Sequence, residues 1–251
     1  VVPQPVGQMP WGHVRTLLAK VKSVDLALLY AQACGEHGWS RTVLEWQIEQ
    51  RFHERAGKAV GNFAQTLPAP QSELVQQSLK DPYVFDFLTL APQAVERDIE
   101  NQLVAQITRF LLELGKGFAF LGRQYPLAVN GRDYFLDLLF YHARLKCYVV
   151  IELKAGAFKP EYVGKLNFYL SAVDDQLRAA DDQPTIGLIL CKDKDKLDVE
   201  YALRDIHKPM GVSSFITKDI PLSVQSQLPT VQEIESELTA LIHDDENTPN
   251  E

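Results

Sequence analysis

Two strongly apolar segments near the middle of the chain predict neighbouring β-strands that carry charged residues. The segments are 134–141 (YFLDLLFY) and 147–154 (CYVVIELK). They contain Asp137, Glu152 and Lys154, and a charge in such a run is costly to bury unless it is paired or binds a metal. These three charges therefore indicate a functional site, with an ordinary surface salt bridge as the alternative.

The pattern around these segments predicts an α-β-β-β-α-β order and thus an α/β fold with a mixed sheet flanked by helices. Apolar positions three and four residues apart favour helices, and short apolar runs favour buried strands. Besides the two central strands, the pattern predicts helices over 93–114, 161–180 and 199–206 and strands over 122–129, 185–191 and 212–217.

A small all-α region is predicted ahead of this domain, over residues 1–66. One helix spans 25–37 with a stop at Gly38, and a second spans 40–55 with Ser40 as its N-cap. Such a pair is similar to a helix-turn-helix, in which basic side chains of the second helix can meet phosphates. A helical packing or dimerisation module is an equally good interpretation. The basic residues are Arg41, Arg51 and Arg55.

Prolines and charge divide the rest of the chain. Pro68 and Pro70 begin a predicted linker with one short helix over 67–92, because prolines this close cannot lie inside a helix. The α/β domain follows over 93–232. The tail over 233–251 has seven acidic residues and no Lys or Arg, which is typical of an acidic C-terminal tail.

Hairpin geometry predicts that the two central carboxylates meet. A turn centred between Arg144 and Leu145 places Asp137 opposite Glu152, with Cβ atoms about 4.5–5.5 Å apart. Side chains alternate along a strand, so Glu152 and Lys154 share a face. A slip of one residue in the register would separate the carboxylates.

These residue types suit the hydrolysis of a phosphodiester. Carboxylate oxygens are ligands that Mg²⁺ prefers, and the backbone carbonyl of Leu153 is a further candidate ligand. A bound metal stabilises charge on the phosphate and lowers the pKa of its water. The ammonium group of Lys154 can position that water or neutralise the transition state. The sequence therefore predicts a metal-dependent phosphodiesterase site.

A fourth carboxylate, Glu100, falls inside the apolar stripe of the helix over 93–114, close to the direction of Ile107. It can reach the metal site as an accessory acid, or it is a first-turn acid favoured by the helix dipole. Glu113 lies on the opposite side of that helix, and we expect it to be solvated.

Several further residues can contact the substrate. Lys165 and Tyr169 lie one turn apart on the helix over 161–180 and can flank the scissile phosphate, although Tyr169 is equally well placed for the core. Lys159 can belong to a basic rim, or to an ordinary solvated face. His142, next to the hairpin turn, is expected at the surface.

Composition narrows the class of protein. A net charge of −8 neither supports nor excludes DNA as a partner, because a nuclease needs only a local basic rim. The three cysteines are scattered, which predicts reduced thiols in a cytoplasmic protein. Because there is no signal peptide, no apolar run of roughly 18 residues and no Gly-rich phosphate loop, we expect neither a membrane partner nor a small-molecule cofactor.

The motifs, in this order, resemble the YhcG-like family of the PD-(D/E)XK nuclease superfamily. Beyond Asp137 and 150–154 (VIELK), the likeness extends to 10–13 (PWGH), 38–41 (GWSR), 62–68 (NFAQTLP), 110–120 (FLLELGKGFAF), 158–162 (FKPEY), 164–170 (GKLNFYL) and 201–205 (YALRD).

The resemblance implies a restriction-endonuclease-like αβββαβ core. It also implies cleavage of DNA with Mg²⁺, or alternatively Mn²⁺, on branched or otherwise structured substrates in recombination, repair or mobile-element defence. On the family pattern Asp137, Glu152 and Lys154 form the catalytic core, with Glu100 as the accessory acid. Many related nucleases have Gln-x-x-x-Tyr on the following helix, and this chain departs from that pattern at Lys165.

Other interpretations stay open. A non-catalytic nucleic-acid-binding or assembly module would keep the fold, although the intact Asp/Glu/Lys set argues against it. An RNA-directed nuclease or toxin is the third hypothesis. A homodimer is an expectation based on the two cuts that a duplex requires. Relatives carry more helical sequence ahead of Pro10, so we expect this chain to lack part of the N-terminal domain.

Overall fold

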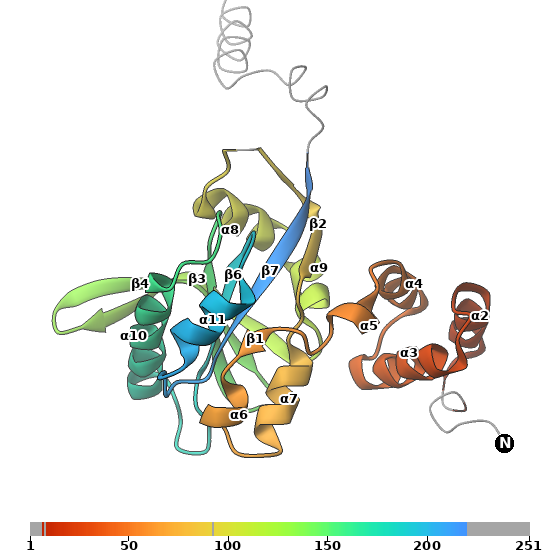
Figure 1. Ribbon diagram of the computed structural model, residues 1–251, viewed down its shortest axis with the longest axis horizontal. Helices are drawn as coiled ribbons and strands as arrows, with labels where there is room; N and C mark the ends of the chain where they lie inside the picture. The colour runs from red at the N-terminus through yellow and green to blue at the C-terminus, as the bar shows by residue number, and fades with distance from the viewer. Residues whose placement is uncertain (1–6, 8, 92, 220–251) are drawn as a thin grey trace, which may run out of the picture. The chain divides into compact units, whose positions relative to one another are not determined.

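Seven strands form one mixed sheet in the computed structural model, which describes residue 7 and residues 9–91 and 93–219 (Figure 1). The strands are β1 (Val60–Gly61), β2 (Tyr83–Leu90), β3 (Phe118–Val129), β4 (Arg132–His142), β5 (Cys147–Leu153), β6 (Ile186–Cys191) and β7 (Met210–Asp219). Their order is β1-β7-β6-β5-β4-β3, and β2 also pairs with β7. The predicted acidic tail over 233–251 lies outside the described residues.

Ten helices accompany the sheet in the described part of the chain, and the N-terminal helices and the sheet belong to one compact unit, residues 1–218. They are α2 (Trp11–Lys20), α3 (Val24–His37), α4 (Arg41–Glu49), α5 (Phe52–Arg55), α6 (Phe63–Thr66), α7 (Gln71–Ser78), α8 (Glu96–Ala105), α9 (Ile107–Leu114), α10 (Glu161–Gln176) and α11 (Lys196–Leu203). The run α8–α9–β3–β4–β5–α10–β6 confirms the predicted αβββαβ core. None of these helices combines the length and apolarity that a bilayer crossing requires.

The sheet has an antiparallel and a parallel half. β3, β4 and β5 pair antiparallel through short turns, whereas β5, β6 and β7 pair parallel. Parallel neighbours need crossover connections, and α10 and α11 provide them. Every residue of β6 is buried, which explains its uninterrupted apolar sequence.

Each face of the sheet has its own core. One face packs side chains such as Phe110, Phe140 and Ile151 under α8 and α9. The other face packs Val150 and Leu166 with the residues under α10 and α11. Figure 1 shows these two helices beside the sheet. Alternation along β5 therefore directs Glu152, two residues after Val150, to the α10 face.

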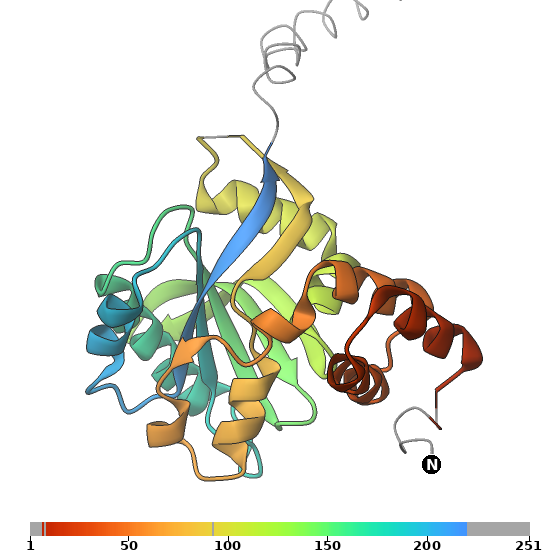
Figure 2. The ribbon, with the colours of Figure 1, turned by 45° about the vertical axis from the view of Figure 1, so that its right-hand side comes forward.

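The stretch over 67–92, which we expected to be a linker with one short helix, also contains a strand. The short helix is present as α7, but β2 follows it and pairs with β7. Figure 2 shows β2 alongside β7. Its bounding prolines suggested breaks, yet five of its eight positions are buried. This segment therefore belongs to the sheet.

The helix predicted over 93–114 is two helices, with Gln106 between α8 and α9. The helix predicted over 40–55 is also divided, because Arg51 adopts a left-handed conformation (φ 50°) between α4 and α5. The stop at Gly38 is confirmed by its φ of 65°, and the Ser40 side chain caps α4 by accepting the Val43 N–H at 3.3 Å.

The N-terminal helices have a small hydrophobic core of their own. Its largest members include Tyr30, Leu44 and Phe52, which come from three helices. The ring of Trp39 stacks on His37 and meets Phe52 edge to face, with centroids 5.3 and 4.9 Å apart. α2 to α5 therefore form a packed helical region.

Candidate functional site

The predicted hairpin register is confirmed. Leu138 pairs with Ile151 and Leu139 with Val150, so the next positions along the two strands are Asp137 and Glu152. Asp137 Oδ2 accepts the backbone N–H of Leu153 at 2.8 Å. This bond holds Asp137 of β4 beside the end of β5, which is the strand that carries Glu152.

Glu152 is fully buried and its two oxygens have different surroundings. Oε1 accepts hydrogen bonds from Lys154 Nζ at 2.8 Å and from Lys165 Nζ at 2.5 Å. Oε2 is buried without a hydrogen-bond partner among the described residues. A buried unpaired carboxylate oxygen is rare, because it loses the full free energy of hydration.

The two lysines approach Glu152 from different depths. The Lys154 side chain is 11% exposed and its ammonium lies 4.9 Å from the ring centroid of Tyr162. The Lys165 side chain is 45% exposed and lies 5.3 Å from the ring centroid of Tyr169. Tyr169 is itself buried in the core, as one of the two predicted interpretations has it.

Burial and charge shift the acid–base properties of the site. Burial, together with the negative charge of Glu152, raises the pKa of Asp137 to about 6. Burial alone would lower the pKa of Lys165, but its hydrogen bond to Glu152 and the charges of both carboxylates outweigh this and raise the pKa. The site thus contains two repelling carboxylates and a firmly protonated ammonium group.

The donor set fits a hard divalent cation such as Mg²⁺. Asp137 and Glu152 offer carboxylate oxygens, and Glu152 Oε2 lacks any other partner in the described structure. No group of three or more His, Cys, Asp or Glu side chains with metal-binding geometry occurs among the described residues. Two carboxylates suffice for Mg²⁺, because this ion commonly keeps several of its waters.

Glu100 is buried as predicted, but its recorded partner is Gln124 of β3, which donates a short hydrogen bond to Glu100 Oε2. One turn earlier, Glu96 Oε1 accepts the N–H of Ala155 at 3.3 Å, so the start of α8 lies next to the end of β5. A role of Glu100 as accessory acid stays a prediction.

The basic residues predicted to contact nucleic acid have different surroundings. Lys159, Arg41 and Arg51 are exposed. Lys165 lies within the carboxylate cluster at Glu152. Arg55 is buried, so the prediction that it contacts a phosphate is wrong.

Glu113, which we expected to be solvated, is fully buried and is the partner of Arg55, with Nη1 and Oε1 2.5 Å apart. Helical phase predicts that this side of α9 faces solvent, and the burial of Glu113 shows that this prediction is wrong. That side of α9 is covered by Lys80 and the start of β2, which the sequence pattern did not place there. His142, also expected at the surface, is buried, and burial lowers its pKa to about 4.

Comparisons with known proteins match both parts of the chain. The family described as the YhcG PDDEXK nuclease domain matches residues 76–229, and the DUF1016 N-terminal domain matches residues 1–55. The Escherichia coli (strain K12) protein called "Putative nuclease YhcG" is 36% identical over 201 residues, which are 79% of this chain and 54% of that protein. The chain thus spans about half the length of this curated relative.

Two solved structures show a weak likeness. A repair endonuclease from Pyrococcus abyssi is 15% identical with a TM-score of 0.34, over 53% of this chain and 50% of that chain. The EndoMS complex with double-stranded DNA is 17% identical with a TM-score of 0.36, over 54% and 49%. At TM-scores this low, neither likeness bears on the function of this chain.

Proposed function

The chain belongs to the YhcG family of PD-(D/E)XK nuclease domains, and we propose that it is a Mg²⁺-dependent nuclease that hydrolyses phosphodiester bonds of DNA. The observation that carries this proposal is the Glu152 carboxylate, which is fully buried beside Asp137 and leaves Oε2 without a partner in the described structure. Burial of such a group is costly unless a ligand compensates it. A cation bound by both carboxylates would provide that compensation.

Each residue then has a role in the reaction. Asp137 and Glu152, with the carbonyl of Leu153, would hold the metal, which neutralises phosphate charge and lowers the pKa of a bound water. The Leu153 N–H orients Asp137 through its 2.8 Å hydrogen bond. Lys154 is the more buried ammonium group and would hold the attacking water or stabilise charge on the phosphate. Lys165, at the exposed side, would meet a phosphate oxygen.

The biological substrate is a finer part of the proposal. The family resemblance supports branched or structured DNA in recombination, repair or mobile-element defence. Lys159 is exposed and lies in the chain between Lys154 and Lys165, so it can bind adjacent backbone phosphates. Mn²⁺ would substitute for Mg²⁺, since both accept oxygen ligands.

Cleavage assays test this proposal directly. The wild-type protein is incubated with linear DNA, branched DNA and RNA, each with Mg²⁺, Mn²⁺ or EDTA. We expect DNA cleavage that requires the metal and that Asp137→Ala abolishes. Asp133→Ala, an exposed carboxylate on the same strand, is the matched control and should cleave like the wild type.

Three outcomes would contradict the proposal. If Asp137→Ala cleaves DNA as fast as the wild type, the carboxylate site does not act in the reaction. Cleavage of RNA alone would favour an RNA-directed nuclease. DNA binding without cleavage under any metal condition would favour the catalytically silent module.

A further inference from the structure

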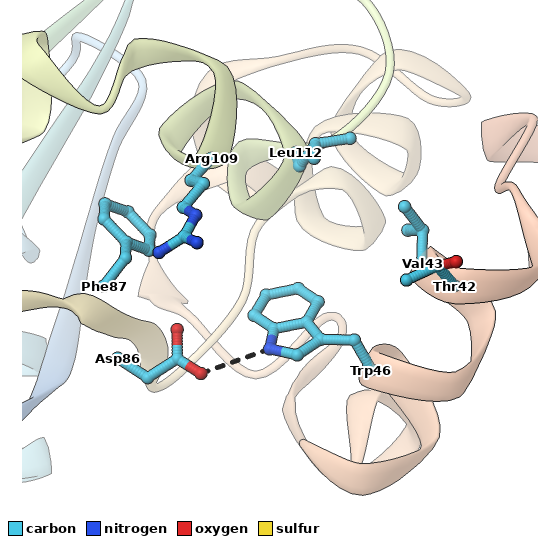
Figure 3. A pocket seen from close by; sticks show the side chains of 7 residues that line it. All are labelled: Thr42, Val43, Trp46, Asp86, Phe87, Arg109 and Leu112. Carbon is cyan, nitrogen blue, oxygen red and sulfur yellow. Dashed lines mark hydrogen bonds between the residues drawn. The ribbon is translucent and has the colours of Figure 1, made fainter.

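A pocket lies away from the carboxylate cluster, between α4, β2 and α9 (Figure 3). Its volume of about 380 Å³ falls within the range of small-ligand sites, roughly 300–1,000 Å³. The nuclease proposal assigns no role to any of its lining residues, which are Thr42, Val43, Trp46, Asp86, Phe87, Arg109 and Leu112.

Two aromatic rings form part of the wall. Trp46 comes from α4 and Phe87 from β2, and both are half-buried. Trp46 Nε1 donates a hydrogen bond to Asp86 Oδ2 at 3.2 Å, which fixes the indole across the pocket (Figure 3). Among the described residues Trp46 has no ring–ring partner, whereas Trp39 packs against two rings. The Trp46 indole is thus a rigid aromatic surface that can accept a stacking ligand.

The polar groups of the pocket balance one another. Arg109 is exposed and has no ion-pair partner within 4 Å among the described residues, and Asp86 is exposed with only the Trp46 contact recorded for its side chain. Figure 3 shows both groups directed into the pocket. The carboxylate of Asp86 would repel a free anion, and the guanidinium group of Arg109 would repel a cation. A neutral, flat ligand with hydrogen-bond donors and acceptors on its edge satisfies both.

We infer that this pocket binds a single unstacked nucleobase of the DNA substrate, an inference that rests on the proposed function. The base stacks on Trp46, its amino group donates to Asp86, and Arg109 donates to a ring nitrogen or carbonyl oxygen. Stacking of a base on an aromatic side chain contributes about 1–3 kcal/mol.

This inference gives the N-terminal helices a role other than that of a helix-turn-helix. A groove-reading helix would present Arg41, Arg51 and Arg55 together, but Arg55 is buried. The pocket instead combines Trp46 of the helical region with residues of the sheet and α9. Substrates with an unpaired base, at a bulge or a branch point, would therefore bind more tightly than uninterrupted duplex.

A binding experiment with matched DNAs tests the pocket. Two duplexes differ at one bulged position, which carries adenine in the first and an abasic residue in the second. Their affinities are measured by fluorescence anisotropy in EDTA, so that no cleavage accompanies binding. We expect the wild type to bind the adenine bulge roughly 10-fold more tightly. Trp46→Ala should remove this preference and Trp46→Phe should keep most of it.

Controls separate the pocket from general effects. Trp11→Ala, at a position that is 71% exposed on α2, should leave the preference unchanged. If Trp46→Ala does not fold, Arg109→Ala replaces it, because its exposed side chain can be removed without disturbing the core; we expect a loss of preference of roughly 3-fold. Equal affinity of the wild type for both DNAs, or an unchanged preference in the folded variants, would overturn the inference.

The pocket and the nuclease proposal fail separately. Asp137→Ala should keep the adenine preference although it does not cleave. A wild-type protein that cleaves DNA but shows no preference would refute the pocket alone. A protein that shows the Trp46-dependent preference without ever cleaving would refute the nuclease proposal alone.

Discussion

Two fully buried glutamates of this chain, Glu113 and Glu152, each have two cationic partners, yet only one of the two clusters is complete. At Glu113, Oε1 accepts from Arg55 Nη1 at 2.5 Å and from the Val84 N–H at 2.8 Å. Oε2 lies 3.3 Å from Lys80 Nζ, which also donates a short bond to the Glu113 carbonyl. Every oxygen of this glutamate has a partner.

At Glu152 both lysines use the same oxygen. Lys154 and Lys165 donate to Oε1, and Oε2 has no partner in the described structure. A second carboxylate, Asp137, lies beside it and raises the electrostatic cost. The cluster at Glu113 has no such like-charged neighbour among its hydrogen-bond partners.

The difference separates a structural role from a functional one. A buried ion pair with every group satisfied holds its surroundings in one arrangement, here the helical region against α9 and β2. A buried carboxylate with an unpaired oxygen and a like-charged neighbour keeps an electrostatic cost that a bound cation would relieve. Burial and charge alone would not distinguish these glutamates, but the count of satisfied oxygens does.

The strongest test exchanges Glu152 for Gln, which keeps the shape and removes the charge. We expect DNA cleavage to fall at least ~10³-fold, about 4 kcal/mol of transition-state stabilisation. The free energy of unfolding should change by about 1 kcal/mol or less, because relief of the Asp137 repulsion offsets the lost lysine contacts. Initial rates and urea denaturation measure the two effects. A large loss of stability would make this cluster structural like the other.

The matched exchange, Glu113→Gln, should give the opposite result. Arg55 and Lys80 would stay buried without their counter-charge, which costs about 3–5 kcal/mol. The free energy of unfolding, measured by urea denaturation, should fall by that amount, while cleavage per folded molecule stays within about 2-fold. A selective loss of cleavage with wild-type stability would show that the Glu113 cluster also acts in the reaction.

The sequence predicts the positions of Asp137 and Glu152 better than it predicts the contacts between the helical region and the sheet. The hairpin register follows from local alternation and one turn, so the positions of Asp137 and Glu152 could be found from two adjacent strands. Glu113 depends on Arg55 and Lys80, which are 58 and 33 residues away in the chain. No local period encodes such contacts.

The lysines and the pocket illustrate the same limit. The position of Lys165 on its helix predicts a place near the substrate, but its contact with Glu152 requires the packing of α10 on the sheet. The pocket at Trp46 needs β2, whose flanking prolines suggested a linker. Helical phase describes one helix at a time, so it does not predict partners that only the packing of distant elements brings together.

Low pH should destabilise the packing of the helical region against α9 and β2, because His37 lies near Lys80 of the Glu113 cluster. Burial, and then the charge of Lys80, lowers the pKa of His37 to about 4. The unfolded chain binds the proton more tightly, so stability is lost as the pH falls from about 6.5 towards 4. We expect a loss on the order of 2 kcal/mol in urea denaturation between pH 7 and pH 4.5.

A substitution isolates this contribution. His37→Phe can keep the ring packing on Trp39 and should remove this part of the pH dependence. The control His207→Phe, at an exposed histidine, should leave the pH dependence unchanged. An identical pH dependence in wild type and His37→Phe would show that the Glu113 cluster tolerates protonated His37 beside its two cations.

The smallest effect is expected at the outer lysine of the incomplete cluster. Lys165→Gln removes a cation that competes with a metal for Glu152, so half-maximal cleavage should need less Mg²⁺. The maximal rate should nevertheless fall roughly 10-fold, about 1.4 kcal/mol, because the ammonium group no longer meets the phosphate. Titrations of Mg²⁺ at saturating DNA measure both quantities, with Lys58→Gln as the exposed control. A structural lysine would lower stability and leave the metal requirement unchanged, so opposite shifts in rate and Mg²⁺ requirement would identify Lys165 as part of the reacting cluster.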